Sequence, residues 1–101
     1  MNKIIESNLN QIRSYCRQFE VEKLHAFGSV TSDKFSDDSD IDFLVKFKHI
    51  SYERHADNYF RLHELFEKLF NRKIDLMTEN MLSNPYFIKK INQTKIILYE
   101  G

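Results

Sequence analysis

The sequence is poor in the residues that bend, interrupt or cross-link a chain, since it has two glycines, one proline, one cysteine and no tryptophan. The single cysteine, Cys16, excludes an internal disulfide bond and fits a reducing compartment. No apolar run approaches the roughly 20 residues of a membrane-spanning helix, and the opening MNKIIESNLNQ lacks the apolar core of a signal peptide. These absences predict a cytoplasmic protein.

A net charge is also lacking, because 15 basic side chains balance 15 acidic ones. No global field therefore draws the chain to nucleic acid or to a membrane. The charges are nevertheless uneven: five aspartates and one lysine lie between Asp33 and Asp42, whereas basic residues predominate after Lys68. An acidic site beside a basic flank suits a metal-bound polyanion, although scattered surface charge explains the same pattern equally well.

Three helices are predicted from the spacing of apolar residues, over 3–19, 52–70 and 85 to about 92. The apolar stripe of the second includes Tyr52, Phe60 and His63. His55 lies eight residues from His63, too far for the adjacent-turn pair of a zinc-binding helix, so both histidines are expected to be structural or solvent-facing. Cys16 falls in the stripe of the first helix, which favours a packed thiol.

Four short apolar runs predict strands, and they alternate with the helices in one domain of the α+β class. A chain of 101 residues is close to the commonest domain size. The predicted strands span residues 21–27, 40–48, 72–78 and 95–99.

Gly28 is the only glycine besides Gly101, and it stands with Ser29 at the end of the first predicted strand. A glycine serves where the backbone takes an unusual conformation or approaches a ligand closely. Residues 29–35 could continue as one or two helical turns whose first N–H groups bind phosphate. A lone Gly-Ser pair is weak evidence by itself, because an ordinary strand-ending turn is the alternative explanation.

Asp40 and Asp42 open the second predicted strand two residues apart, so both side chains point to the same face. Like charges this close disfavour each other's ionised form unless a cation lies between them. Mg²⁺ is commonly held by one or two carboxylates together with substrate phosphates. Asp75 interrupts the third predicted strand, and proximity to the other two carboxylates across a sheet would explain its presence there.

Together these residues predict a two-metal site for phosphoryl transfer. One Mg²⁺ held by Asp40 and Asp42 would also bind a triphosphate, and a second shared with Asp75 would lower the pKa of an acceptor hydroxyl. The turn at Gly28 and Ser29 would hold the departing phosphates.

The segment FGS, ten residues and DIDF resembles the signature of the polymerase-beta-like nucleotidyltransferases. With KIDLMT and IILYE, the chain resembles the minimal nucleotidyltransferases (MNT proteins) from Leu24 to Glu100. That resemblance implies the small mixed sheet flanked by helices of this fold. The catalytic, metal-binding carboxylates that it implies are Asp40, Asp42 and Asp75. The nucleotide-binding residues that it implies are Gly28, Ser29 and Lys34.

The resemblance further implies an antitoxin that transfers AMP from ATP to a tyrosine of a partner HEPN toxin and releases pyrophosphate. One departure concerns the pattern GSxARGxA of many relatives, because Ser32 and Asp33 replace its arginine and glycine. Lys34 or a basic residue from elsewhere would then have to contact the triphosphate.

The aspartates also have other interpretations. A calcium-binding loop starting at Asp38 is excluded, since its sixth position would be Phe43 rather than Gly and its twelfth His49 rather than Glu. A solvated acidic turn and an antitoxin that acts by contact alone both stay open. Transfer to RNA is less expected because no basic, aromatic-rich extension is evident, and homo-oligomer formation is left open.

Overall fold

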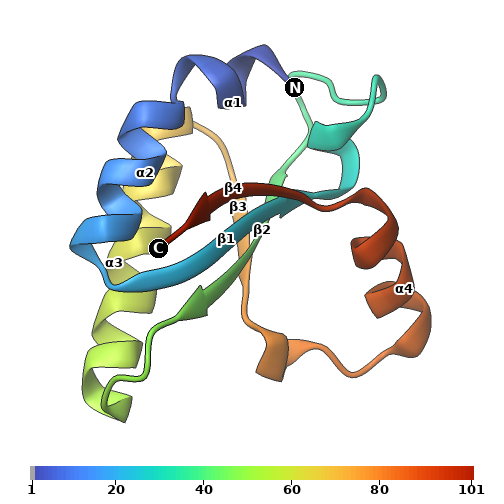
Figure 1. The fold of residues 1–101 in the computed structure, drawn as a ribbon. Coiled ribbons are helices and arrows are strands. Elements are labelled where there is room, and N and C mark those ends of the chain that lie inside the picture. The colour runs from blue at the N-terminus through green and yellow to red at the C-terminus, as the bar shows by residue number, and fades with distance from the viewer. Residues whose placement is uncertain (1) are drawn as a thin grey trace.

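Four strands form a single mixed sheet in the computed structural model, which describes residues 2–101 (Figure 1). They are β1 (Val21–Phe27), β2 (Ile41–Phe47), β3 (Ile74–Met77) and β4 (Ile96–Glu100). Their order is β3-β2-β1-β4, with β1 antiparallel to β2 and to β4 and with β2 parallel to β3. The predicted α+β class and mixed sheet are therefore confirmed.

The helices divide between the two sides of the sheet. They are α1 (Lys3–Ser7), α2 (Leu9–Gln18), α3 (Tyr52–Phe70), α4 (Pro85–Thr94) and the 3-10 turns η1 (Gly28–Thr31) and η2 (Glu79–Met81). In Figure 1, α2 and α3 lie together on one side of the strands, and α4 lies apart on the other. The long α3 connects β2 to β3, because parallel strands cannot be joined by a tight turn.

The main core lies between the sheet and the helices α2 and α3. Alternate residues of β2 point into it, and Ile41, Phe43 and Val45 are at most 1% exposed. Phe43 packs on Phe66 of α3 with ring centroids 4.8 Å apart. Burial of one such side chain contributes about 1.5–3 kcal/mol to stability. Because Ile41, Phe43 and Val45 are all buried on one face of β2, the residues between them must point to the opposite face.

A smaller apolar cluster lies on the opposite face of the sheet and holds α4. It contains Phe27, Leu44 and Ile91, with Met77 and Leu82 at its edge. Because Ile91 is 1% exposed, α4 is anchored beside the strand ends that carry the candidate site.

The bounds of α3 and β1 are those predicted from the sequence. Ser51 caps the start of α3 by accepting a hydrogen bond from the Arg54 N–H at 3.3 Å, and Asn71 ends it in the left-handed conformation (φ 49°). Cys16 is fully buried, which confirms the prediction of a packed thiol. None of the helices formed by residues 2–101 combines the length and apolar character needed to cross a membrane.

The prediction of one helix over residues 3–19 was wrong, because the chain forms α1 and α2 with a break at Asn8. The Asn8 side chain donates a hydrogen bond to the Ile4 carbonyl at 2.8 Å, and its backbone leaves the helical region. Asparagine side chains compete in this way with helical backbone bonds.

Other predicted bounds were too wide or assigned exposed residues to the core. β2 begins after Asp40, β3 is shorter than 72–78, η1 replaces the turns expected over 29–35, and α4 continues to Thr94. Tyr52 and Phe60 are 96% and 68% exposed although the helical spacing placed them in the apolar stripe. The stripe is narrower than predicted because the sheet covers only the side of α3 that carries Leu62, Phe66 and Phe70.

Candidate active site

Gly28 directly follows β1 in a conformation that favours glycine, with φ +76°. Its N–H donates a hydrogen bond to the Thr94 hydroxyl of α4 at 3.2 Å, and its carbonyl accepts one from the Thr31 hydroxyl at 2.7 Å. The turn is therefore held from two sides, and Gly28 and Ser29 are the first two residues of η1.

Asp42 and Asp75 are register partners on the parallel strands β2 and β3. Both side chains point away from the main core, Asp42 half-buried and Asp75 exposed. The predicted proximity of Asp75 to the β2 carboxylates is therefore confirmed for Asp42. Phe27 is the register partner of Asp42 on β1, which places Asp42 beside the Gly28 turn as well.

The Asp42 carboxyl is held in an unfavourable environment for a negative charge. Burial first, then the charge of Asp75 and less strongly that of Asp40, raise the pKa of Asp42 from 3.8 to about 7. A half-buried carboxyl that is ready to lose its proton near neutral pH is frequent in catalytic and cation-binding sites.

Asp40 lies just before β2 and faces a different partner. Its carboxylate is 3.8 Å from the Lys73 ammonium, in an ion pair that is largely exposed. Arg72 holds the loop before it by donating hydrogen bonds to the carbonyls of Ser36 (3.2 Å) and Ser39 (2.9 Å). Asp40 therefore lies near Asp42 and Asp75, but its ion pair is with Lys73.

Within the described part of the chain, residues 2–101, no three His, Cys, Asp or Glu side chains are arranged so that they could hold a metal ion together. The three-carboxylate arrangement expected from the sequence is therefore incomplete, with Asp42 and Asp75 adjacent and Asp40 displaced toward Lys73. Two adjacent carboxylates with mutually unfavourable charge do fit a hard divalent cation such as Mg²⁺, whose remaining ligands are commonly water and substrate phosphates.

A cavity of about 490 Å³ lies between the Gly28 turn and α4. The predicted residues Gly28, Ser29, Lys34 and Asp42 all line it. The same cavity has an apolar wall, where Phe27 and Phe87 pack edge to face with centroids 6.1 Å apart. One polar end and one aromatic wall suit a ligand with phosphates and a flat ring.

Residues of α4 that sequence reasoning did not identify complete this cavity. Phe87, Lys90, Ile91 and Thr94 line it at helical spacing, three or four residues apart. Lys90 thus brings a positive charge to this cavity from a distant part of the chain. It is a residue of the kind expected to compensate for the arginine that Ser32 replaces. One signal in the sequence concerned these residues, the amphipathic pattern of α4. That pattern does not show which part of the fold the helix packs against.

A second hollow of about 460 Å³ lies on the other side of the carboxylate pair. Asp75 lines it with Tyr59 and His63 of α3, and Phe87 borders both hollows. Asp75 therefore borders a second space, next to the cavity that Asp42 lines.

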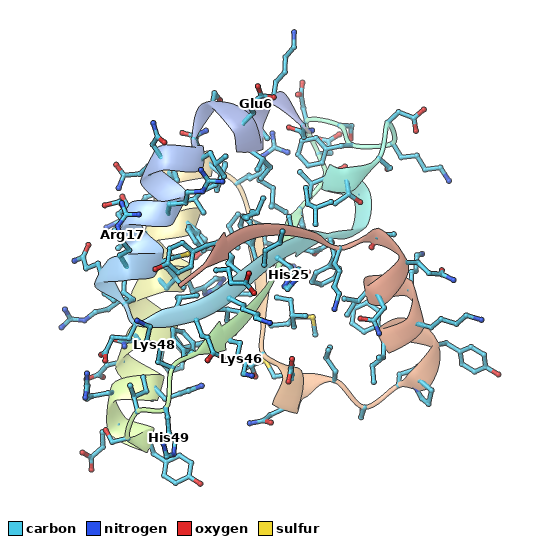
Figure 2. All side chains as sticks on the ribbon, viewed as in Figure 1. Glu6, Arg17, His25, Lys46, Lys48 and His49 are labelled. Carbon is cyan, nitrogen blue, oxygen red and sulfur yellow. The ribbon has the colours of Figure 1, made fainter. Side chains whose placement is uncertain are left out.

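The sheet face that carries Asp42 continues toward basic residues. Figure 2 labels His25 on β1 and Lys46 on β2, and both line a small hollow with Lys23 and Lys95. Burial and the nearby Lys95 and Lys23 lower the pKa of His25. Much of this positive charge is neutralised locally, because Lys23 and Lys46 form exposed ion pairs at 3.4 and 3.2 Å with Glu100 and Glu22.

Comparisons with known proteins show the family and the fold of the chain. The model of the family described as "Polymerase beta, Nucleotidyltransferase" matches residues 10–101. The chain is 33% identical over 79 residues to "Putative protein adenylyltransferase MJ1379" of Methanocaldococcus jannaschii, covering 78% of both chains.

Solved structures share the fold. One described as a putative minimal nucleotidyltransferase has a TM-score of 0.68 at 24% identity, over 95% of both chains. Another, described as a tri-AMPylated HEPN toxin of Shewanella oneidensis in complex with its MNT antitoxin, has a TM-score of 0.59 at 16% identity. That match covers 95% of this chain and 72% of the other.

Proposed function

This chain belongs to the polymerase beta nucleotidyltransferase family, and on that premise we propose that it transfers AMP from ATP to a protein hydroxyl. The observation that carries the proposal is the carboxylate pair Asp42 and Asp75 beside the positive-φ turn at Gly28. The relative in M. jannaschii, described as a putative protein adenylyltransferase, supports AMP as the transferred group.

In this reaction the acceptor oxygen forms a bond to the α-phosphorus of ATP while the bond to the bridging oxygen of the β-phosphate breaks. Pyrophosphate leaves, and the acceptor hydroxyl releases its proton to the solvent. Such reactions depend mainly on positioning and on neutralising charge. Lys34 and Lys90 line the cavity beside Gly28 and Ser29, where they would bind the phosphates. Phe87 would contact the base on the apolar wall.

Asp42 and Asp75 would hold the Mg²⁺, with Asp40 joining them if its side chain leaves Lys73. When bound, Mg²⁺ neutralises phosphate charge and lowers the pKa of a coordinated hydroxyl. Asp42 would lose its proton near neutral pH, which fits a ligand that is free to exchange a proton for a cation.

The acceptor in this proposal is a tyrosine of a HEPN toxin encoded nearby, and the chain is its antitoxin. The structure similar to this chain that contains an AMPylated HEPN toxin with its MNT antitoxin supports this partner.

The test is incubation of the chain with α-labelled ATP, Mg²⁺ and the neighbouring HEPN-type protein. Label should appear on the partner, and Asp42→Asn or Asp75→Asn should reduce the rate at least about 100-fold. Asp57→Asn on the exposed side of α3 is the matched control and should have no effect. Tight binding without label would instead support an antitoxin that acts by contact, and transfer that survives Asp42→Asn would refute the assigned site.

A further inference from the structure

Two side chains of α3 bond to the backbone on either side of Asp75. The Tyr59 hydroxyl donates a hydrogen bond to the Leu76 carbonyl at 2.5 Å. His63 Nε2 lies 2.8 Å from the Ile74 carbonyl oxygen, and a bond there requires the proton on Nε2. Tyr59 and His63 are four residues apart, one helical turn, and their rings are stacked with centroids 6.3 Å apart.

These contacts matter because β3 is a four-residue edge strand, and among the strands of residues 2–101 it pairs with β2 alone. In a parallel ladder, backbone groups of alternate residues point to the neighbouring strand and the others point away. The Lys73 carbonyl accepts a bond from the Ile41 N–H at 3.2 Å, so the carbonyls of Ile74 and Leu76 belong to the outer edge. Tyr59 and His63 therefore replace the missing neighbouring strand.

We propose that Tyr59 and His63 are positioning residues that hold Asp75 beside Asp42 by fixing the outer edge of β3. This role deepens the proposed function and rests on it. Neither side chain has to touch the reacting atoms, because each acts through the backbone that carries the Asp75 side chain. The geometry is specific, since the two bonds are made at the residues immediately before and after Asp75.

The surroundings of Tyr59 agree with this role. It lines the same hollow as His63 and Asp75, so the three side chains surround one space. Burial and the charge of Asp75 raise the pKa of Tyr59, as expected of a phenol hydroxyl close to that carboxylate. The remaining exposure of the Asp75 carboxylate leaves it free to bind a cation or a substrate.

The experiment compares Tyr59→Phe, His63→Leu and His63→Gln, of which the last retains an N–H donor near the position of Nε2. Tyr52→Phe removes an exposed hydroxyl of the same helix and is the matched control. Affinity for Mn²⁺ alone is measured by electron paramagnetic resonance, and kcat and KM for ATP are measured in the transfer reaction. Tyr59→Phe and His63→Leu should each weaken Mn²⁺ binding and lower kcat by about tenfold, with KM changing less than about twofold. His63→Gln should recover most of the loss.

A double-mutant cycle separates positioning from general destabilisation. If Tyr59 acts through Asp75, Tyr59→Phe should have little further effect in an Asp75→Asn background. Equal losses in both backgrounds, or unchanged kcat and Mn²⁺ affinity in Tyr59→Phe and His63→Leu of an active protein, would overturn the positioning role and leave the proposed function intact. A wild type that binds Mn²⁺ but transfers no AMP refutes the function alone, and the Mn²⁺ cycle then decides the positioning. A wild type that does neither refutes both.

Discussion

Gly28 leaves the space that the carboxylate of Asp42 occupies, since a Cβ at Gly28 would lie 2.5 Å from Asp42 Oδ2. The relationship follows from the register of the sheet, in which Phe27 pairs with Asp42 and Gly28 continues past the end of β1. The turn proposed to bind phosphate and Asp42, the proposed cation ligand, are therefore in close steric contact. A change in either residue is expected to move the other.

Gly28→Ala should damage both stability and activity. The positive φ alone costs about 1–2 kcal/mol for a residue with a Cβ, and the new methyl group would displace the Asp42 carboxylate as well. Urea unfolding at pH 8 should show a loss of at least this size. Ser29→Ala is the control, expected to change the free energy of unfolding by less than about 0.5 kcal/mol, because its side chain is only partly buried. An unaltered unfolding midpoint in Gly28→Ala would contradict the geometry.

Asp42→Asn should make the cation-free protein more stable at high pH. Between pH 3.8 and about 7 the folded chain keeps a proton on Asp42 that the unfolded chain has released, so stability falls as pH rises through this window. The pKa difference corresponds to roughly 4 kcal/mol at most. Since Asp42 is only half-buried, solvent screening reduces this to about 1–2 kcal/mol at pH 8. Thermal unfolding in EDTA should show a gain that shrinks from pH 8 to pH 5. A gain independent of pH, or an equal one in Asp57→Asn, would argue against it.

Local patterns in the sequence were sufficient to predict the frame of the site. Alternation in β2 directed Ile41 and Phe43 to the core and Asp42 away from it, and a single charged residue in β3 indicated Asp75. These predictions depend only on periodicity and on the cost of burying charge, which are properties of neighbouring residues.

The parts that could not be predicted depend on contacts between distant segments. Thr94 meets Gly28 across 66 positions of the chain, and no local pattern reports that α4 ends there. The ion pair of Asp40 with Lys73 is likewise a contact between distant segments of the chain. The exposure of Phe60 follows from the limited width of the sheet that α3 covers.

Mg²⁺ should stabilise the protein more at pH 8 than at pH 6. A cation displaces the proton of Asp42, so below a pKa of about 7 each pH unit should weaken the apparent affinity about tenfold. Thermal unfolding with and without saturating Mg²⁺ measures this, and EDTA should reverse the shift. Asp75→Asn should abolish most of the shift and Asp57→Asn none of it. A shift of equal size at both pH values would show that Asp42 is not a ligand.

Lys90→Ala should weaken ATP binding, because Lys90 and Lys34 are the cationic side chains that line the cavity beside Gly28. Lys89 is the matched control: it is the neighbouring residue, it carries the same charge, it is exposed, and it does not line this cavity. Loss of one phosphate contact should raise the Kd for ATP by about tenfold, as expected of a charged hydrogen bond worth 1.5–3 kcal/mol that is partly screened by solvent. Lys90→Arg should retain most of the affinity, whereas Lys89→Ala should be indistinguishable from wild type by calorimetric titration with ATP. Equal losses in Lys89→Ala and Lys90→Ala would mean that only the net charge of α4 matters, and that Lys90 does not replace the arginine absent at Ser32.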